Sequence, residues 1–205
     1  MLTTRYKAVF NRVFDPVADI LVRCGIGPST VTIAGLIFTA ASCAFLLITH
    51  RVVAFCFLVT FATLFDAFDG AVARRSGRVT RFGAYLDAMV DRYEEALVLI
   101  AVAMETGYWL LSMWLLTGCV LVSYAKARAA MEAPISNGEW PDMMERMERD
   151  VIYVVGLLIS ALVPRRIAGE DVFWWTLVVL CVLVHATVLQ RFWRARALIA
   201  ARGGP

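Results

Sequence analysis

The sequence predicts an all-α integral membrane protein with six transmembrane helices preceded by an N-terminal amphipathic interfacial helix. Three observations lead to this prediction. Of the 205 residues, 60% are hydrophobic and only 18% are charged, against roughly 25% charged residues in ordinary soluble domains. The apolar residues form long runs, which suit membrane-spanning helices better than the short alternating strands of a barrel. No polar stretch is long enough for a soluble domain, so we expect residues 1–205 to form one transmembrane domain.

Residues 1–27 are expected to form a juxtamembrane amphipathic helix. They mix basic residues such as Arg5 with large apolar residues such as Phe10 and Phe14, a composition typical of helices that lie on a membrane surface. An ordinary solvated lead-in is the alternative. Glycine and proline at residues 25–28 should end the helix. This stretch does not resemble a cleavable signal peptide, so the first span would itself direct insertion.

Six apolar runs follow and form the predicted bundle, residues 28–190. We expect spans at about residues 29–48, 52–75, 82–104, 109–130, 150–163 and 172–189. The polar residues 131–148 are expected to form a loop, and residues 191–205 a basic cytoplasmic tail. Because the number of spans is even, both termini should lie on one side of the membrane.

The distribution of Lys and Arg predicts the orientation in the cell membrane. One side collects the basic residues of both termini, of residues 74–81 and of residues 126–149, while the other has only Arg51, Arg165 and Arg166. The positive-inside rule therefore places the termini, and the acidic residues described next, at the cytoplasmic face. The formal charge of +3 and the lack of a basic stripe with interleaved aromatic residues do not fit a nucleic-acid-binding surface.

Four aspartates stand out in the second and third predicted spans, since a charge at membrane depth costs a few kcal/mol or more. They are Asp66, Asp69, Asp87 and Asp91. Their spacings of three and four residues place each pair on one face of its own helix. If the two helices face each other, four carboxylates meet, and they repel one another unless cations neutralise them. Divalent cations with oxygen ligands are the expected occupants.

The aspartates belong to a longer pattern of fixed spacing. It is Asp66-x-x-Asp69-Gly70-x-x-Ala73-Arg74, then eight residues, then Gly83-x-x-x-Asp87-x-x-x-Asp91. This pattern resembles in full the signature of the CDP-alcohol phosphotransferases, membrane enzymes of phospholipid synthesis. The length, the six expected spans and the amphipathic start fit the same family, so the resemblance covers nearly the whole chain. It also implies a homodimer.

The resemblance implies a role for each aspartate. Asp66 and Asp87 would bridge two divalent ions, Mg²⁺ or Mn²⁺, while Asp69 completes one ion and Asp91 the other. Two metals about 3.5 to 4 Å apart suit in-line phosphoryl displacement. The family also assigns its last aspartate, here Asp91, as the catalytic base that takes the proton from the acceptor hydroxyl. Metal ligation lowers the basicity of a carboxylate, so these two roles of Asp91 compete.

Other positions of the pattern correspond to the family's contacts with the CDP-lipid. They are Ser29, Thr30, Val31, Thr32, Gly70, Arg74 and Thr80. A guanidinium group matches the geometry of a pyrophosphate, and a glycine allows a close approach of backbone or substrate. The donor would be CDP-diacylglycerol or CDP-archaeol, because the sequence does not distinguish ester from ether lipid tails.

The second half of the chain resembles the inositol-phosphate branch of this family, which comprises prokaryotic phosphatidylinositol-phosphate synthases and their archaeal counterparts. The residues that hold the acceptor's phosphate in that branch correspond here to Lys126, Arg149 and Arg191. A dianionic acceptor needs such a cationic pocket. Alternatively, these side chains lie at the cytoplasmic rim and extend into the interface.

These residues predict a transferase in which the acceptor hydroxyl, deprotonated by Asp91, attacks the lipid-side phosphorus of the CDP-lipid and releases CMP. The expected acceptor is inositol 1-phosphate (1L numbering), and glycerol 3-phosphate is the alternative.

Two non-enzyme alternatives are an intramembrane cation transporter and a scaffold. A transporter should distribute its acids across the bilayer, and a scaffold should tolerate the neutralisation of all four aspartates.

Overall fold

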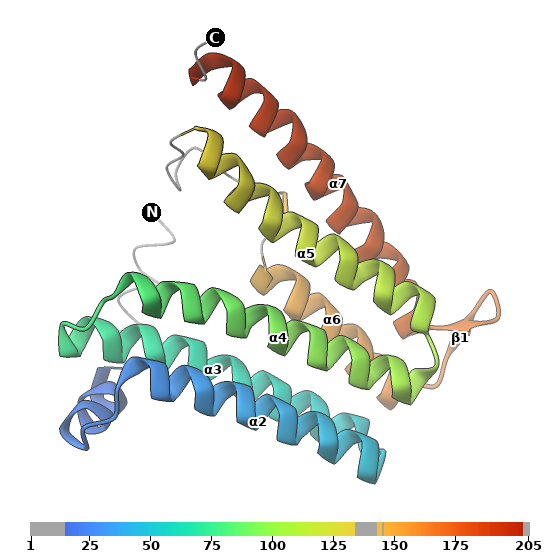
Figure 1. Ribbon diagram of the computed structural model, residues 1–205. Coiled ribbons are helices and arrows are strands. Elements are labelled where there is room, and N and C mark those ends of the chain that lie inside the picture. The colour runs from blue at the N-terminus through green and yellow to red at the C-terminus, as the bar shows by residue number, and fades with distance from the viewer. Residues whose placement is uncertain (1–14, 134–142, 145, 203–205) are drawn as a thin grey trace. The chain divides into compact units, whose positions relative to one another are not determined.

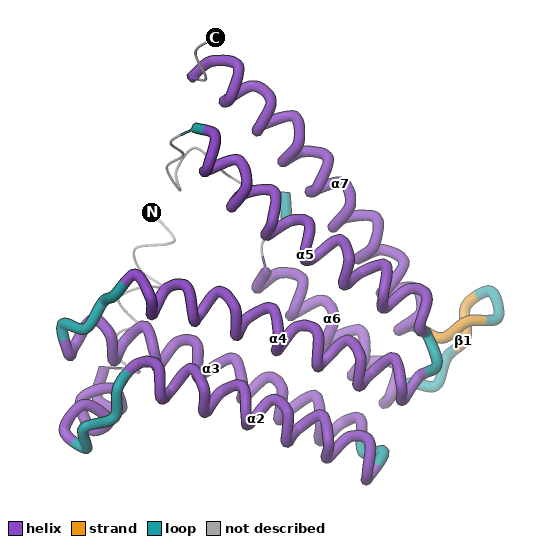
Figure 2. The backbone as a smooth tube through the Cα atoms, viewed as in Figure 1, coloured by secondary structure: helices purple, strands orange, loops and turns teal. Residues whose placement is uncertain are grey.

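The computed structural model describes residues 15–133, 143, 144 and 146–202, and almost all of this part is helical (Figure 1). Residues 15–23 form a short helix. It is followed by α2 (Pro28–Thr49), α3 (Val52–Ser76), α4 (Arg81–Thr106), α5 (Trp109–Glu132), α6 (Arg146–Leu162) and α7 (Val172–Arg202). An antiparallel pair of two-residue strands, β1 (Arg166–Ile167) and β2 (Glu170–Asp171), connects α6 to α7 (Figure 2). The predicted all-helical class is confirmed.

Four helices are long and apolar enough to cross a membrane, namely α2, α3, α5 and α7. They confirm a multi-pass membrane protein. The other two long helices do not meet both criteria of length and apolar composition. Helix α4 carries several charged residues in its first half. Helix α6 has only 17 residues, about the shortest length that spans a bilayer. A bundle of six spans therefore stays a prediction.

Two helix ends differ from those predicted. Helix α6 begins at Arg146, inside the predicted loop 131–148, and α7 continues to Arg202, well beyond residue 189. Residues 190–202 contain no glycine or proline and are rich in Arg and Ala, which favour helix. The change from apolar to basic composition marks the end of an apolar run, and the helix continues past it. Residues 1–14 of the predicted interfacial helix and 203–205 of the tail lie outside the described residues.

The chain divides into two compact units, Met1–Ala101 and Val102–Pro205, with the division inside α4. In the first unit, the helix at residues 15–23 packs against the C-terminal part of α3. Ala18 is fully buried in an apolar cluster with Val31 and Val72. Arg75 of α3 also forms ion pairs with Asp15, at 3.1 Å, and with Asp19, at 3.4 Å. Apolar and ionic contacts together attach this short helix to α3.

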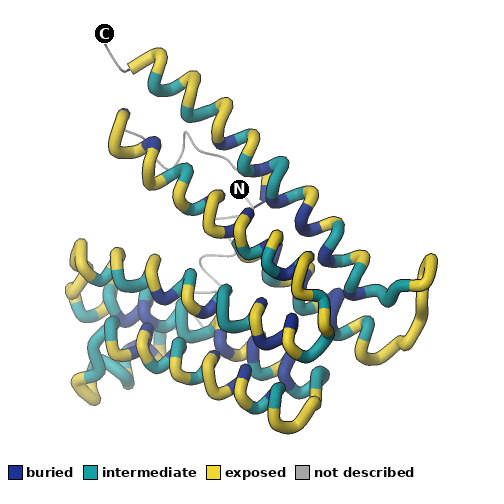
Figure 3. The backbone as a smooth tube through the Cα atoms, turned by 45° about the vertical axis from the view of Figure 1, so that its right-hand side comes forward, coloured by how far each residue is buried: buried dark blue, intermediate teal, exposed yellow. Residues whose placement is uncertain are grey.

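In the second unit, α7 packs against both α5 and α6. Buried and exposed residues alternate along α7 (Figure 3). Small residues allow these close approaches, as is common between membrane helices. A Cβ atom at Gly118 of α5 would lie 2.6 Å from Val184, and one at Gly156 of α6 would lie 2.4 Å from Thr176. Either position should reject a larger residue.

Asp171 links the start of α7 to the loop before α5. One carboxylate oxygen accepts a hydrogen bond from the Trp174 backbone N–H, and the other accepts one from the Tyr108 hydroxyl, both at 2.8 Å. Burial and the bond to Asp171 raise the pKa of Tyr108 to about 12, above its ordinary value, so the phenol keeps its proton and donates throughout the physiological pH range.

Replacing Asp171 by Ala should therefore lower the unfolding temperature in detergent, because the loss of a helix N-cap costs about 0.5 to 2 kcal/mol. Asp171→Asn keeps an oxygen that can accept from Trp174 and should lose less. Thermal unfolding of both variants measures the difference. Equal unfolding temperatures for the wild type and Asp171→Ala would contradict the capping role.

Candidate metal and phosphate site

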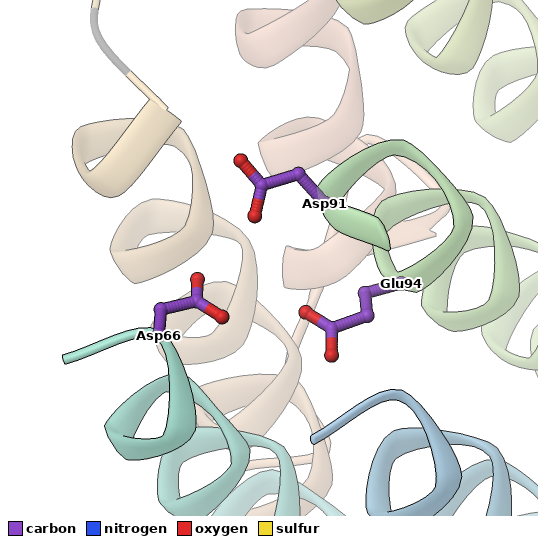
Figure 4. A group of neighbouring side chains, drawn as sticks. All are labelled: Asp66, Asp91 and Glu94. Carbon is purple, nitrogen blue, oxygen red and sulfur yellow. The ribbon is translucent and has the colours of Figure 1, made fainter. Parts of the chain in front are cut away.

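A cluster of three carboxylates forms the centre of the candidate site. Asp66 projects from α3, and Asp91 and Glu94 project from α4 toward it (Figure 4). One oxygen from each side chain can be chosen so that all three lie within 4.8 Å of one another. Two of the aspartates predicted to bind metal are thus brought together. The third member, Glu94, was not among the predicted residues.

Asp69 lies beside this cluster and is fixed by α2. Its side chain is 7% exposed, and the Thr32 hydroxyl donates a hydrogen bond of 2.6 Å to it. Asp69 also interacts electrostatically with Asp66 and Asp87. The four predicted aspartates therefore share one acidic region, in which Thr32 orients Asp69. A contact of Thr32 with a CDP-lipid stays a prediction.

Arg92 offsets part of the negative charge in this region. Its guanidinium Nη2 lies 3.6 Å from an Asp91 carboxylate oxygen, and its Nε lies 3.7 Å from Glu95. Arg92 is half-buried, which strengthens such a pair relative to a fully solvated one. Asp91, the predicted base, therefore has a cationic neighbour that the sequence pattern did not single out.

The predicted phosphate-contacting residues lie at the adjoining ends of α3 and α4. A Cβ atom at Gly70 would lie 3.3 Å from a guanidinium nitrogen of Arg74, so the absence of a side chain at Gly70 lets Arg74 lie close to the helix. The Thr80 hydroxyl accepts a hydrogen bond of 2.9 Å from the Gly83 N–H and caps the first turn of α4. Both Arg74 and Thr80 are exposed, so their polar groups are open to a ligand.

Residues 29–32, also predicted to contact the CDP-lipid, form the first turn of α2. They differ in burial: Thr30 is exposed, while Val31 packs in the apolar cluster with Ala18. Any contact of Val31 with a polar ligand would therefore use its backbone. The Thr30 and Val31 N–H groups already donate to the Gly27 carbonyl, at 3.1 and 3.3 Å.

The three basic residues predicted to hold the acceptor's phosphate lie in the second unit, on three different helices. Arg149 on α6 is 5% exposed, Arg191 on α7 is 6% exposed, and Lys126 on α5 is half-buried. Arg191 donates a hydrogen bond to the Val122 carbonyl of α5. Such burial of the two arginines is not expected of side chains that extend from a rim into the membrane interface. A phosphate pocket formed by the three residues stays a prediction.

The comparisons with known proteins agree with this chemistry. The family model described as CDP-alcohol phosphatidyltransferase matches residues 25–140. The phosphatidylinositol phosphate synthase of Mycobacterium tuberculosis (strain H37Rv) is 32% identical over 202 residues, which cover 94% of this chain and 91% of that protein. The archaetidylinositol phosphate synthase of Pyrococcus horikoshii is 31% identical over 161 residues, covering 78% and 84% of the two chains.

Solved structures of a relative are also similar. The crystal structure of the M. tuberculosis phosphatidylinositol phosphate synthase with CDP-DAG bound has a TM-score of 0.78 and 30% identity, covering 90% of this chain and 94% of that one. The same enzyme in complex with manganese and citrate has a TM-score of 0.78 and 29% identity, covering 89% and 88%. The family match extends over more than half of the sequence and includes all four aspartates. This chain therefore belongs to the CDP-alcohol phosphatidyltransferase family.

Proposed function

We propose that this protein transfers the phosphatidyl or archaetidyl group of a CDP-lipid to a hydroxyl of inositol phosphate and releases CMP. The observation that carries the proposal is the convergence of carboxylates from α3 and α4, on the two halves of the family's motif. The relatives named above as phosphatidylinositol phosphate and archaetidylinositol phosphate synthases support the choice of substrates.

The carboxylates fit divalent cations. Asp69 and Glu94 are buried, and Asp66 and Asp91 are close to Glu94, so the region carries a concentration of like charges that a cation would relieve. Hard oxygen ligands suit Mg²⁺ or Mn²⁺, and a structure of a relative contains manganese. Asp66, Asp69, Asp87 and Asp91 would hold two such ions. When bound, they would polarise the phosphoryl oxygens and stabilise the charge that develops on the leaving CMP.

The chain's own residues have separate tasks in the reaction. Arg74 and Thr80 would hold the pyrophosphate of the CDP-lipid. Asp91 would accept the proton of the acceptor hydroxyl, whose oxygen bonds to the lipid-side phosphorus as the bond from that phosphorus to CMP breaks. Arg92, with its Nη2 3.6 Å from an Asp91 carboxylate oxygen, would help to hold this carboxylate in position. Thr32 keeps Asp69 in place through its hydrogen bond.

Lys126, Arg149 and Arg191 would bind the phosphate of the acceptor. Charge-assisted hydrogen bonds from Lys and Arg suit a dianionic phosphate. The same chemistry would hold glycerol 3-phosphate, which is the alternative acceptor. Inositol without a phosphate offers these cations no partner and should react poorly.

The membrane arrangement proposed for this chain is a single domain of six spans, with both termini and the active site at the cytoplasmic face of the cell membrane. The family match crosses the division between the two compact units at residue 101, which supports one functional domain. The helix at residues 15–23, attached to α3, would belong to an interfacial helix on that face. A homodimer is also part of the proposal.

The substrate assignment is tested with purified full-length protein, CDP-diacylglycerol in mixed micelles, Mg²⁺ and a panel of acceptors. We expect inositol 1-phosphate to give faster CMP release than glycerol 3-phosphate, inositol or no acceptor. Faster release with glycerol 3-phosphate would transfer the assignment to that alternative. If none of the acceptors gives CMP, the enzyme assignment is wrong. Replacing CDP-diacylglycerol with CDP-archaeol in the same assay compares the two lipid donors.

A further inference from the structure

Glu94 lies outside the spacing that relates the four aspartates, yet its carboxylate belongs to their cluster. We propose that Glu94 is a fifth carboxylate of the metal centre and a direct ligand of a divalent cation. The proposal rests on the proposed function, because it concerns the cations that this function requires. It assigns a ligand that the Asp66 to Asp91 pattern does not contain.

The distances fit shared coordination. Oxygen ligands bind Mg²⁺ at about 2.0 to 2.1 Å and the larger Ca²⁺ at about 2.3 to 2.6 Å, so two oxygens on one ion lie at most about 4 to 5 Å apart, depending on the ion. The chosen oxygens of Asp66, Asp91 and Glu94 lie within 4.8 Å of one another. Figure 4 shows the three side chains converging from two helices. One ion could therefore contact all three side chains after only small adjustments.

The face of α2 next to Glu94 is shaped to accept its carboxylate. Gly35 and Thr39 are four residues apart and so lie on one face of α2. A Cβ atom at Gly35 would lie 2.9 Å from the Cβ of Phe65 on α3 and 3.3 Å from Glu94 Oε1, so the glycine makes room for both side chains. The buried Thr39 hydroxyl donates a hydrogen bond of 3.4 Å to Glu94 Oε1. Thus α2 leaves space for the carboxylate and orients it, while α4 directs it toward Asp66.

Burial gives Glu94 a physical reason to bind a cation. Only 8% of the residue is exposed, and the nearby carboxylates of Asp66 and Asp91 carry the same charge. Burying a carboxylate among like charges is costly unless a cation pairs with it, and a bound divalent cation would offset that cost. A ligand at Glu94 would also reduce the share of coordination that falls on Asp91, whose tasks as ligand and as base compete.

Binding of Mn²⁺ to the purified full-length protein in detergent, without substrate, tests the proposal directly. Electron paramagnetic resonance measures the free Mn²⁺ in a titration. Glu94→Gln nearly preserves shape and should raise the Kd for Mn²⁺ by about tenfold or more, since removal even of an outer-shell partner typically costs 10- to 100-fold. The matched control is Glu105→Gln, which makes the same change further along α4 and should leave the Kd unchanged. If both variants bind Mn²⁺ like the wild type, the proposal is overturned.

Thermal unfolding distinguishes a ligand from a residue that merely holds helices together. If Glu94 is a ligand, Glu94→Gln without metal should unfold at the wild-type unfolding temperature or above it. Addition of Mn²⁺ should then raise the unfolding temperature of the variant by less than it raises that of the wild type. If Glu94 is purely structural, the opposite is expected: Glu94→Gln without metal should unfold at a lower temperature than the wild type, and Mn²⁺ should raise the unfolding temperature of both proteins equally. If Glu94→Gln does not fold, Glu94→Asp serves instead, and its Kd for Mn²⁺ should also increase. An unchanged Kd in that variant would count against the proposal.

The result is separable from the proposed function. If the wild type shows Glu94-dependent Mn²⁺ binding but no acceptor gives CMP, the transferase assignment fails and the ligand assignment stands. If the wild type releases CMP and Glu94→Gln binds Mn²⁺ normally, only the ligand assignment fails.

Discussion

Replacing Asp66 by Asn should lower the rate of CMP release by roughly 10³-fold, the upper range for removal of one group that stabilises charge in a transition state. Asp66 is the only member of the described three-carboxylate cluster contributed by α3. Its neutralisation would leave Asp69 as the one remaining α3 carboxylate among the four proposed to hold the cations, and it would weaken the stabilisation of the leaving CMP. Asn has nearly the same shape as Asp, so the fold should be retained. The rate is measured with saturating CDP-lipid, acceptor and Mg²⁺.

Asp15→Asn is the matched control for this variant, because it makes the same chemical change in the same unit. Asp15 is partly exposed and pairs with Arg75, and an exposed ion pair contributes at most about 1 kcal/mol. Its rate of CMP release should therefore stay close to that of the wild type. Comparable activity in Asp66→Asn and Asp15→Asn would contradict a catalytic role for the carboxylate cluster.

Lys126→Gln should raise the KM for inositol phosphate by about 10- to 100-fold, since a hydrogen bond to a charged group contributes about 1.5 to 3 kcal/mol. The KM for the CDP-lipid should change little, because that substrate would be held by Arg74 and Thr80. Of the three basic residues assigned to the acceptor, Lys126 is the least buried, so its replacement should disturb packing least. Steady-state kinetics with each substrate varied in turn separates the two effects.

Arg128→Gln controls for a general loss of positive charge, since Arg128 is exposed and lies two residues from Lys126 on α5. Its side chain is paired with Glu132. The two positions lie on different sides of the helix, because residues two apart do not share a face. An equal increase in the acceptor KM for both variants would show that Lys126 acts only through the charge of the rim.

The sequence predicted which helices carry the site, because long apolar runs and the spacing of the aspartates are local features. It could not identify Glu94. Glu94 and Glu95 follow Asp91 by three and four residues, and both spacings place a side chain near the same face of a helix. Only the packing of α2 and α3 separates them: Glu94 joins Asp66, while Glu95 pairs with Arg92.

Other features missing from the sequence prediction are also products of tertiary contact. The hydrogen bond from Thr32 to Asp69 joins residues 37 positions apart, and helical periodicity carries no information about such a pair. Helix α7 extends to Arg202, beyond the apolar run that predicts a span at residues 172–189. Polarity reports where apolar burial ends, whereas a helix ends where the backbone is broken or capped.

The central claim is that the carboxylates of α3 and α4 catalyse transfer from a CDP-lipid to inositol phosphate. Mass spectrometry of the lipid products formed from CDP-diacylglycerol and inositol 1-phosphate, with wild-type protein and with Asp91→Asn, tests it most directly. The wild type should form phosphatidylinositol phosphate and CMP in equal amounts, and Asp91→Asn should form neither at a comparable rate. Absence of that lipid with the wild type, or equal yields from both proteins, would contradict the claim.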